Sequence, residues 1–257
     1  MFPCRLIIDP PQSGVRNMVV DECLLEEAAD EGVATLRFYQ WSEPILSLGY
    51  FQKYEDRQSH TGSQSLPVVR RLSGGGTLLH DQELTYSLCL PSDHAAVQEP
   101  SRIYRVVHQA AIDALAQQDI TLKFWDDFAK KLPTEDEPDE PFLCFQRRTD
   151  DDLVVPTETA PGSIKILGSA QRRRRGAVLQ HGALLLSASP YAEELSGIQE
   201  ASGVHVDISK ACENWANRIA ESLDLLLNPA EPLRESQEST QTKIEKRLTS
   251  DEWVRKR

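Results

Sequence analysis

The sequence predicts an α+β domain in which helices pack on mixed, largely antiparallel sheets. Apolar runs of strand length outnumber helical patterns, and the two kinds occur in mixed order along the chain. The expected strands cover residues 6–9, 35–41, 45–51, 68–72, 77–90, 120–125, 152–155, 164–168 and 177–186. The expected helices cover residues 18–29, 102–117 and 209–227.

Boundary signals accompany each expected helix. Asn17, Ser101 and Ser209 stand at the starts, where a short polar side chain accepts a backbone hydrogen bond. Gly32 is expected to end the first helix because glycine readily takes the left-handed conformation. Pro229 stops the last helix because proline cannot continue one.

A chain of 257 residues is long enough for one substantial core. We expect one domain over residues 1–230, followed by a polar tail or peripheral helix over residues 231–257, where Ser, Gln and Glu dominate. Residues 133–141 are charged, contain proline and offer no apolar position, which predicts an exposed loop.

Composition excludes several function classes. The net charge of −12 argues against a nucleic-acid partner. No apolar run approaches the ~20 residues of a membrane span, and the N-terminus does not resemble a signal peptide. We therefore expect a soluble, cytoplasmic protein with no membrane partner. Five cysteines without paired metal-ligand spacing predict neither a disulfide framework nor a metal site.

The stretch LPVVRRLSGGGTLLHDQELTYSLCL, residues 66–90, concentrates groups suited to ligand binding. Two expected strands are joined by Ser73 and the glycines Gly74–Gly76, which remove every Cβ and allow positive φ angles. Arg70 and Arg71 add guanidinium groups that suit carboxylate or phosphate oxygens. The residues alone leave two interpretations open, a β-hairpin with a flexible glycine tip and a ligand cradle.

The longer pattern RRLSGGGTLLHDQELTYSL resembles the signature of the biotin/lipoate protein ligase catalytic domain, the family of lipoate-protein ligases and octanoyltransferases. Two more blocks resemble this family in the same order: WSEPILSLGYFQ at 41–52, and KILGSAQ at 165–171, which runs on to VLQHG at 178–182. The resemblance implies the family's α+β fold. It also implies that substrate is bound by Arg70, Arg71, Ser73, Gly74, Gly75, Gly76, His80, Gly168, Ser169, Ala170 and His181.

Lys165 is the first candidate catalytic residue. A lysine at the start of a strand is by itself an ordinary surface residue. The resemblance implies that this lysine contacts the acyl carbonyl or an adenylate, and that it serves as acid or base in the transferases. Gly168, Ser169 and Ala170 are small enough to let an acyl chain pass, although a tight strand crossing would explain them equally.

Cys144 is the second candidate. Cys23, Cys89 and Cys212 have apolar or helical surroundings and are expected to be buried as small hydrophobic residues. Cys144 instead follows the acidic loop, and the resemblance places it at the Cys-Phe pair of octanoyltransferases that work through an acyl-cysteine. A thiolate accepts an acyl group from one thioester and leaves readily to an amine. The alternative is a structural core cysteine.

Two histidines and a basic run complete the candidates. His80 is expected to orient the glycine loop and His181 to shape the acyl pocket, and neither is expected to carry the proton. The run of four arginines at 172–175 is either a solvated loop or an attraction for an acidic partner domain.

The function expected from the resemblance is transfer of an octanoyl or lipoyl group from a carrier-protein thioester to a lysine of a lipoyl domain, through an acyl-cysteine. No cofactor is expected. The implied donor is acyl carrier protein or glycine cleavage H protein, and the implied acceptor is a lipoyl domain.

Two alternatives stay open. The first is an ATP-dependent lipoate-protein ligase that forms a lipoyl-adenylate, because the Gly-Gly-Gly turn matches the ligases. Against it, the residues after His80 and Asp81 resemble the transferases, and the chain has no room for the extra domain of about a hundred residues that bacterial ligases carry. The second is a non-catalytic protein that binds lipoyl domains.

Overall fold

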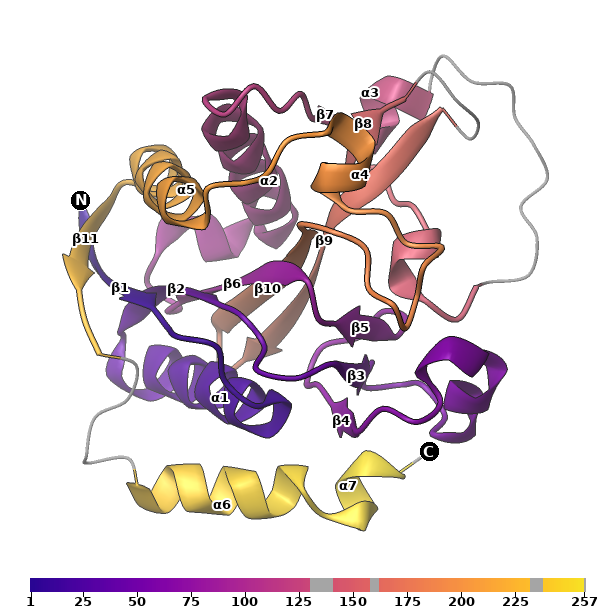
Figure 1. The fold of residues 1–257 in the computed structure, drawn as a ribbon. Helices are drawn as coiled ribbons and strands as arrows, with labels where there is room; N and C mark the ends of the chain where they lie inside the picture. Colours follow the sequence, from indigo (N-terminus) through magenta and orange to yellow (C-terminus); the bar gives the residue numbers. More distant parts are fainter. Residues whose placement is uncertain (130–140, 158–161, 232–237, 257) are drawn as a thin grey trace.

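The computed structural model describes residues 1–129, 141–157, 162–231 and 238–256, and shows helices on both faces of a large sheet (Figure 1). Within these ranges, no helix combines the length and apolar character that crossing a membrane requires. The same ranges contain no group of three or more His, Cys, Asp or Glu side chains placed to hold a metal ion.

The main sheet has eight strands in the order β11-β1-β2-β6-β10-β9-β8-β7. β1 is parallel to both of its neighbours, and every other neighbouring pair is antiparallel. This arrangement confirms the predicted α+β class with largely antiparallel pairing. The strands are β1 (Phe2–Ile8), β2 (Ala34–Tyr39), β6 (Glu83–Leu90), β7 (Lys123–Phe124), β8 (Leu153–Pro156), β9 (Ser163–Arg174), β10 (Ala177–Leu185) and β11 (Leu225–Pro229).

A second sheet of three strands, β4-β3-β5, carries the glycine turn. β3 (Ile45–Leu48) is central, parallel to β4 (Val68–Arg70) and antiparallel to β5 (Leu78–His80). The predicted hairpin is therefore wrong, because β3 lies between the two strands that the turn connects. The expected strand 77–90 is also divided: it bends at Asp81 and Gln82, so β5 stays in the small sheet and β6 enters the main one.

The helices cover the main sheet on both faces (Figure 1). α2 (Pro100–Ala116) and α5 (Ile208–Leu223) pack on one face and share the largest apolar cluster with the sheet. α1 (Gly14–Glu31) lies on the other face. The shorter helices are α3 (Trp125–Ala129), α4 (Ile198–Ser202), α6 (Glu238–Leu248) and α7 (Asp251–Val254), with 3₁₀ turns η1 (Glu55–Ser59), η2 (Thr61–Ser63), η3 (Ala95–Gln98) and η4 (Cys144–Gln146).

The predicted helix starts are wrong by one to four residues. α1 begins at Gly14 because Ser13, not Asn17, is its N-cap and accepts from the backbone N–H of Arg16. α2 begins at Pro100, whose fixed φ suits the first helical position. α5 follows Asp207, which accepts from the N–H of Lys210.

The helix ends show one prediction confirmed and one wrong. Gly32 ends α1 with a φ of 71°, as expected. α5, however, ends at Leu223 because Asp224 takes a left-handed conformation with a φ of 54°. The three leucines that follow, expected to be helical, instead form β11 beside β1.

Other expected elements match with shifted bounds. The strand expected at 120–125 is only the two-residue β7, because α3 begins at Trp125. The strand expected at 45–51 ends at Leu48. The loop predicted at 133–141 lies outside the described residues except for Pro141. In the region 231–257, residues 238–254 form α6 and α7, and α6 packs on α1.

The centre of the main sheet leaves no room for a side chain at Gly182. A Cβ there would lie 2.2 Å from the hydroxyl of Ser169 and 2.7 Å from the carbonyl oxygen of Gly168, both on the neighbouring β9. We expect Gly182→Ala to lower the free energy of unfolding by about 1–3 kcal/mol, as overpacked cores do. Urea unfolding measures the change.

Gly74→Ala is the matched control. A Cβ at Gly74 would meet only the ring of Phe51, at 3.7 Å, which is an ordinary contact. Its free energy of unfolding should stay within about 0.5 kcal/mol of the wild type. Equal stability of the two variants would contradict the packing of β9 on β10.

Candidate active site

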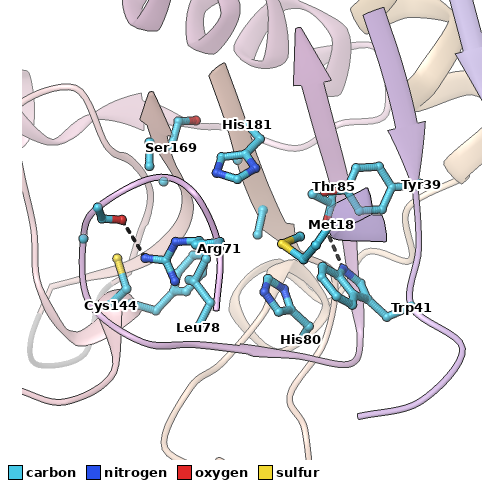
Figure 2. A pocket seen from close by; sticks show the side chains of 17 residues that line it. Met18, Tyr39, Trp41, Arg71, Leu78, His80, Thr85, Cys144, Ser169 and His181 are labelled. Atoms are coloured by element: carbon cyan, nitrogen blue, oxygen red, sulfur yellow. Dashed lines mark hydrogen bonds between the residues drawn. The ribbon is translucent and has the colours of Figure 1, made fainter. Parts of the chain in front are cut away.

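A pocket lies where β9 and β10 of the main sheet face the glycine turn, β5 and η4. It contains about 520 Å³ of empty space, including its open mouth. Figure 2 shows Cys144 beside Arg71 at one end of the pocket, with Tyr39 and Trp41 at the other end and His181 between them. The predicted site residues that line it are Arg71, Gly74, Gly75, His80, Cys144, Gly168, Ser169, Ala170 and His181.

The glycine turn is held in place by Arg71. This buried guanidinium donates to the carbonyl oxygens of Gly74 at 2.8 Å and Gly76 at 2.6 Å, and to that of Ser47 at 2.7 Å. Gly75 has a φ of 89°, a conformation that side chains with a Cβ rarely adopt. The turn is thus a hydrogen-bonded loop at the pocket wall, which favours the cradle interpretation over a flexible hairpin tip.

Arg71 also supplies positive charge near Cys144. Burial lowers the pKa of Arg71 to about 10, while a thiolate at Cys144 acts in the opposite direction. The guanidinium is therefore a cation at neutral pH. Its Nε–H is buried and has no hydrogen-bond acceptor among the described residues.

Arg70 does not line the pocket, although it was expected to bind substrate. The side chain is fully buried, and Nη1 donates to the carbonyl oxygens of Gly49 and Gln52, both at 2.8 Å. Nε and Nη2 donate to the backbone of α7. Its described hydrogen bonds thus connect segments of the protein.

Cys144 is the only one of the five cysteines that is not buried. It begins η4, and its backbone N–H donates at 2.8 Å to the carbonyl oxygen of Thr77, the residue between the glycine turn and β5, so this residue positions it. Burial raises the pKa of Cys23 and Cys212 to about 12, and that of Cys89 well above its ordinary value. The expected burial of these three thiols is confirmed.

Lys165 reaches the segment that carries Cys144 rather than the pocket. Its ammonium lies 2.7 Å from a carboxylate oxygen of Asp152 and donates to the carbonyl oxygens of Arg147 at 2.9 Å and Cys144 at 3.3 Å. Both side chains of the ion pair are almost completely buried. In this arrangement Lys165 fixes the backbone at the first residue of η4 and at the residue that follows it.

His181 belongs to a buried chain of polar groups behind the glycine turn. Its Nε2 lies 2.5 Å from the hydroxyl of Ser73, and its Nδ1 lies 3.2 Å from Asp21. Burial raises the pKa of Asp21, but hydrogen bonding by His181 and the charge of Arg37 outweigh it and leave the pKa below its ordinary value. Asp21 is therefore ionised, and it fixes the ring of His181 between two elements.

Sequence reasoning missed Asp21, and a signal for it existed. Asn17 and Asp21 are one helical turn apart and share the face of α1 that also presents Leu24. Polar residues on a buried face need partners. Here the partner is Arg37 of β2, which bonds to both side chains.

His80 supports one wall of the pocket. Its ring stacks on Trp41 at a centroid distance of 3.7 Å, and its nitrogens bond to Glu83 and Ser47, both at 2.7 Å. The indole N–H of Trp41 donates to the hydroxyl of Thr85 at 2.9 Å. Met18, Tyr39 and Trp41, none of them predicted, therefore form a fixed apolar end to the pocket.

Ser169 is oriented from beneath by His108, a further residue that sequence reasoning missed. Nδ1 of His108 lies 2.5 Å from the carbonyl oxygen of Asp151, so this nitrogen carries the proton. Nε2 therefore accepts from the hydroxyl of Ser169 at 2.7 Å, and the phenol of Tyr86 donates to the same hydroxyl oxygen. Burial lowers the pKa of His108, which keeps its ring neutral.

The arginine run at 172–175 braces the turn between β9 and β10. Arg174 and Arg175 pair with Glu26 of α1 at 2.6 and 2.5 Å. Arg173 donates to the carbonyl oxygen of Val97, and Arg172 lies over the ring of Tyr50. These contacts account for the run within the chain, so neither a free solvated loop nor an acidic partner is needed to explain it.

Residues 13–241 match the family model described as the lipoyl protein ligase A/B catalytic domain. The chain belongs to this family. Two curated relatives are named octanoyltransferase LipM: that of Brevibacillus brevis is 27% identical over 97% of each chain, and that of Staphylococcus aureus is 30% identical over 93% of each chain. The family predicted from the three sequence blocks is confirmed.

Solved structures share the fold. A putative lipoate protein ligase from T. acidophilum, solved with bound lipoic acid, superimposes with a TM-score of 0.74 at 20% identity and covers 100% of both chains. A lipoate-protein ligase A bound with ATP gives a TM-score of 0.73 at 20% identity, covering 99% of this chain and 98% of the other. The predicted ligase-like fold is confirmed.

The ion pair of Lys165 with Asp152 leads to a prediction about stability. Lys165→Met would leave a buried carboxylate without its ammonium partner. We expect the free energy of unfolding to fall by about 3–5 kcal/mol, because an uncompensated buried charge is costly. Lys210→Met is the control: Lys210 pairs with Asp207 at the surface at 3.5 Å, and its loss should cost less than about 1 kcal/mol. Equal effects would contradict a structural role for Lys165.

The lowered pKa of His108 leads to a prediction about pH. The folded protein holds the ring neutral, whereas the unfolded chain binds a proton near the ordinary value of 6.5. This contribution to stability is fully present above that value and is lost as the pH falls below it. Between about pH 7.5 and 5, wild-type protein should lose more free energy of unfolding than His108→Gln does.

His205→Gln is the control for this pH series, because His205 is exposed. Urea unfolding at each pH gives the comparison. The same pH dependence in wild-type protein and in His108→Gln would rule out a neutral, buried imidazole.

Proposed function

We propose that this protein is an octanoyltransferase that moves an octanoyl group from a carrier-protein thioester to a lysine of a lipoyl domain through an acyl-cysteine at Cys144. One observation carries the proposal: the only cysteine that is not buried lies at one end of a largely apolar pocket, beside a buried cation. The names of the relatives support octanoyl as the group transferred. The family description supports lipoyl proteins as acceptors.

The reaction has two steps. The thiolate of Cys144 attacks the thioester carbonyl of the donor, a new carbon–sulfur bond forms, and the thiolate of the carrier leaves. The acceptor lysine amine then attacks the acyl-cysteine, the amide bond forms, the amine loses its proton to a base, and the thiolate of Cys144 leaves. The cationic guanidinium of Arg71 lies beside Cys144 and complements the negative charge that the sulfur carries in both steps.

We propose that Lys165 acts by holding the backbone that carries Cys144. Its ammonium donates to the carbonyl oxygens of Cys144 and Arg147, which supports a role in positioning the nucleophile. Proton transfer by Lys165 stays a prediction. For the acyl chain, the pocket provides apolar walls that extend toward Met18 and Trp41.

The hydrogen bonds of the two arginines favour transfer without ATP over the ligase alternative. A guanidinium group can bind phosphate or carboxylate oxygens of a ligand only with N–H groups that the protein does not already use. Both Nη groups of Arg70 and of Arg71 already donate to backbone carbonyls of the protein. We therefore propose that no cofactor takes part, and that acyl carrier protein or glycine cleavage H protein is the donor.

Mass spectrometry of the intact protein tests the nucleophile. Incubated with an octanoyl thioester and no ATP, the protein should gain one octanoyl group that neutral hydroxylamine removes, since this reagent cleaves thioesters but not amides. Cys144→Ser should show no hydroxylamine-sensitive label, because a hydroxyl cannot replace a thiolate at neutral pH. Cys212→Ser is the control and should label like the wild type.

Other outcomes identify the alternatives. Strict dependence on ATP and free lipoate, with Cys144→Ser fully active, would establish a ligase. Retention of a lipoyl domain with neither adduct nor turnover would establish a non-catalytic binding protein. Parallel reactions with octanoyl-acyl carrier protein and octanoyl-H protein identify the donor.

A further inference from the structure

The end of the chain packs against the elements that build the pocket. Residues 238–256, which comprise α6 and α7 and are called the C-terminal clamp below, run beneath α1 and finish beside β4 (Figure 1). Ile244 and Leu248 of α6 are buried in one apolar cluster with the pocket residues Met18, Tyr39 and Trp41. The clamp therefore shares a core with the far end of the pocket.

Arg70 connects α7 to the small sheet. Its Nη2 donates to the carbonyl oxygen of Val254 at 2.8 Å, and its Nε lies within 3.2 Å of those of Trp253 and Val254. The indole N–H of Trp253 returns a hydrogen bond to the carbonyl oxygen of Arg70 at 2.9 Å. Backbone and side chain of Arg70 are thus both engaged by α7.

The other side of the same guanidinium holds the loop next to the glycine turn. Nη1 of Arg70 donates to the carbonyl oxygens of Gly49 and Gln52. The N–H of Tyr50 in this loop donates to the carbonyl oxygen of Ser73 at 2.8 Å. A Cβ at Gly49 would lie 2.1 Å from the carbonyl oxygen of Gly75, so loop and turn are in direct contact.

Aromatic contacts reinforce this connection. The ring of Tyr50 lies 5.7 Å from that of Trp253 in an edge-on arrangement, and the ammonium of Lys256 lies 3.3 Å from the centre of the Tyr50 ring. Arg247 of α6 lies over the ring of Trp253 at 4.1 Å. Contacts of this kind stabilise the position of an aromatic side chain that is only partly buried.

We propose that the C-terminal clamp positions the glycine turn for acyl transfer, and that Trp253 is the positioning residue at its centre. This inference rests on the proposed function. The connection runs from Trp253 through Arg70 to the loop at Gly49–Gln52 and on to the turn that lines the pocket beside Cys144. A small displacement of the turn would misplace the acyl carbonyl, whereas Trp41 at the apolar end keeps its contacts with Thr85 and His80.

The test compares Trp253→Ala and Trp253→Phe in the 257-residue chain. For Trp253→Ala we expect the maximal rate of Cys144 acylation by an octanoyl thioester to fall at least about tenfold, since misplacement of reacting groups by ~1 Å can cost a hundredfold. The thioester concentration for half-maximal rate should change less than about threefold, because Trp41 at the apolar end is also held by Thr85 and His80, which lie outside the clamp. Trp253→Phe keeps an aromatic ring but loses the indole N–H. Its acylation rate should lie between those of the wild type and Trp253→Ala.

Ile219→Ala is the matched control. Ile219 is fully buried in α5, in the apolar cluster on the opposite face of the sheet, so its loss destabilises the protein without touching the clamp. Its acylation rate should stay within about twofold of the wild type. If Trp253→Ala is slowed no more than Ile219→Ala, Trp253 acts only through stability and the proposal fails.

Hydrogen exchange tests the role of the clamp independently of the proposed function. The amide of Tyr50, which bonds to Ser73, should exchange faster in Trp253→Ala than in wild-type protein with no substrate present. Unchanged exchange at Tyr50 would overturn the connection. If wild-type protein takes up no octanoyl group, the proposed function fails, while the exchange measurement still decides whether the clamp holds the turn.

Discussion

The pairing of two buried guanidinium groups with backbone carbonyls is the constraint on which the rest of the site depends. Arg70 ends β4 and Arg71 follows it, and both are almost completely excluded from solvent. A buried cation is tolerated only where its N–H groups find acceptors, and loop carbonyls away from water need donors. The Nη groups of both arginines donate to backbone carbonyls: Arg71 closes the glycine turn, and Arg70 joins the neighbouring loop to α7.

A buried cation also donates to backbone carbonyls at Cys144, the proposed nucleophile. Lys165 is buried with Asp152, and its remaining donors go to the carbonyl oxygens of Cys144 and Arg147. Two cationic side chains, Arg71 and Lys165, therefore fix the two segments that meet at the pocket, the glycine turn and the turn that carries Cys144. Since the carbonyls of both segments are engaged, the backbone is pre-organised before any acyl group arrives, which lowers the cost of reaching the reactive geometry.

Much of the candidate site was accessible from the sequence because its chemistry is local. The glycine turn requires residues without a Cβ, and Gly75 does adopt a positive φ. The sequence distinguished Cys144 from the cysteines with apolar or helical surroundings, and Cys144 is the cysteine that is not buried. Asp21 and His108 were missed because they act on His181 and Ser169 from α1 and α2. The spacing of Asn17 and Asp21 indicates a polar face on α1, but it does not identify His181 as the partner. The expected hairpin is wrong for the same reason. Strand propensity does not specify which strand pairs with which, and β3 lies between β4 and β5 in the small sheet.

The sequence alone was sufficient for the fold class, the family and the residue types of the site, because periodicity, turn chemistry and three ordered blocks are properties of neighbouring residues. Only the tertiary structure decided what each charged group does. Arg70, expected to hold substrate, bonds to the protein's own backbone, and the polar end of the chain became a clamp packed on α1. Hydrogen-bond partners are chosen by proximity in space, and Arg70 and Val254 become neighbours only when the chain has folded.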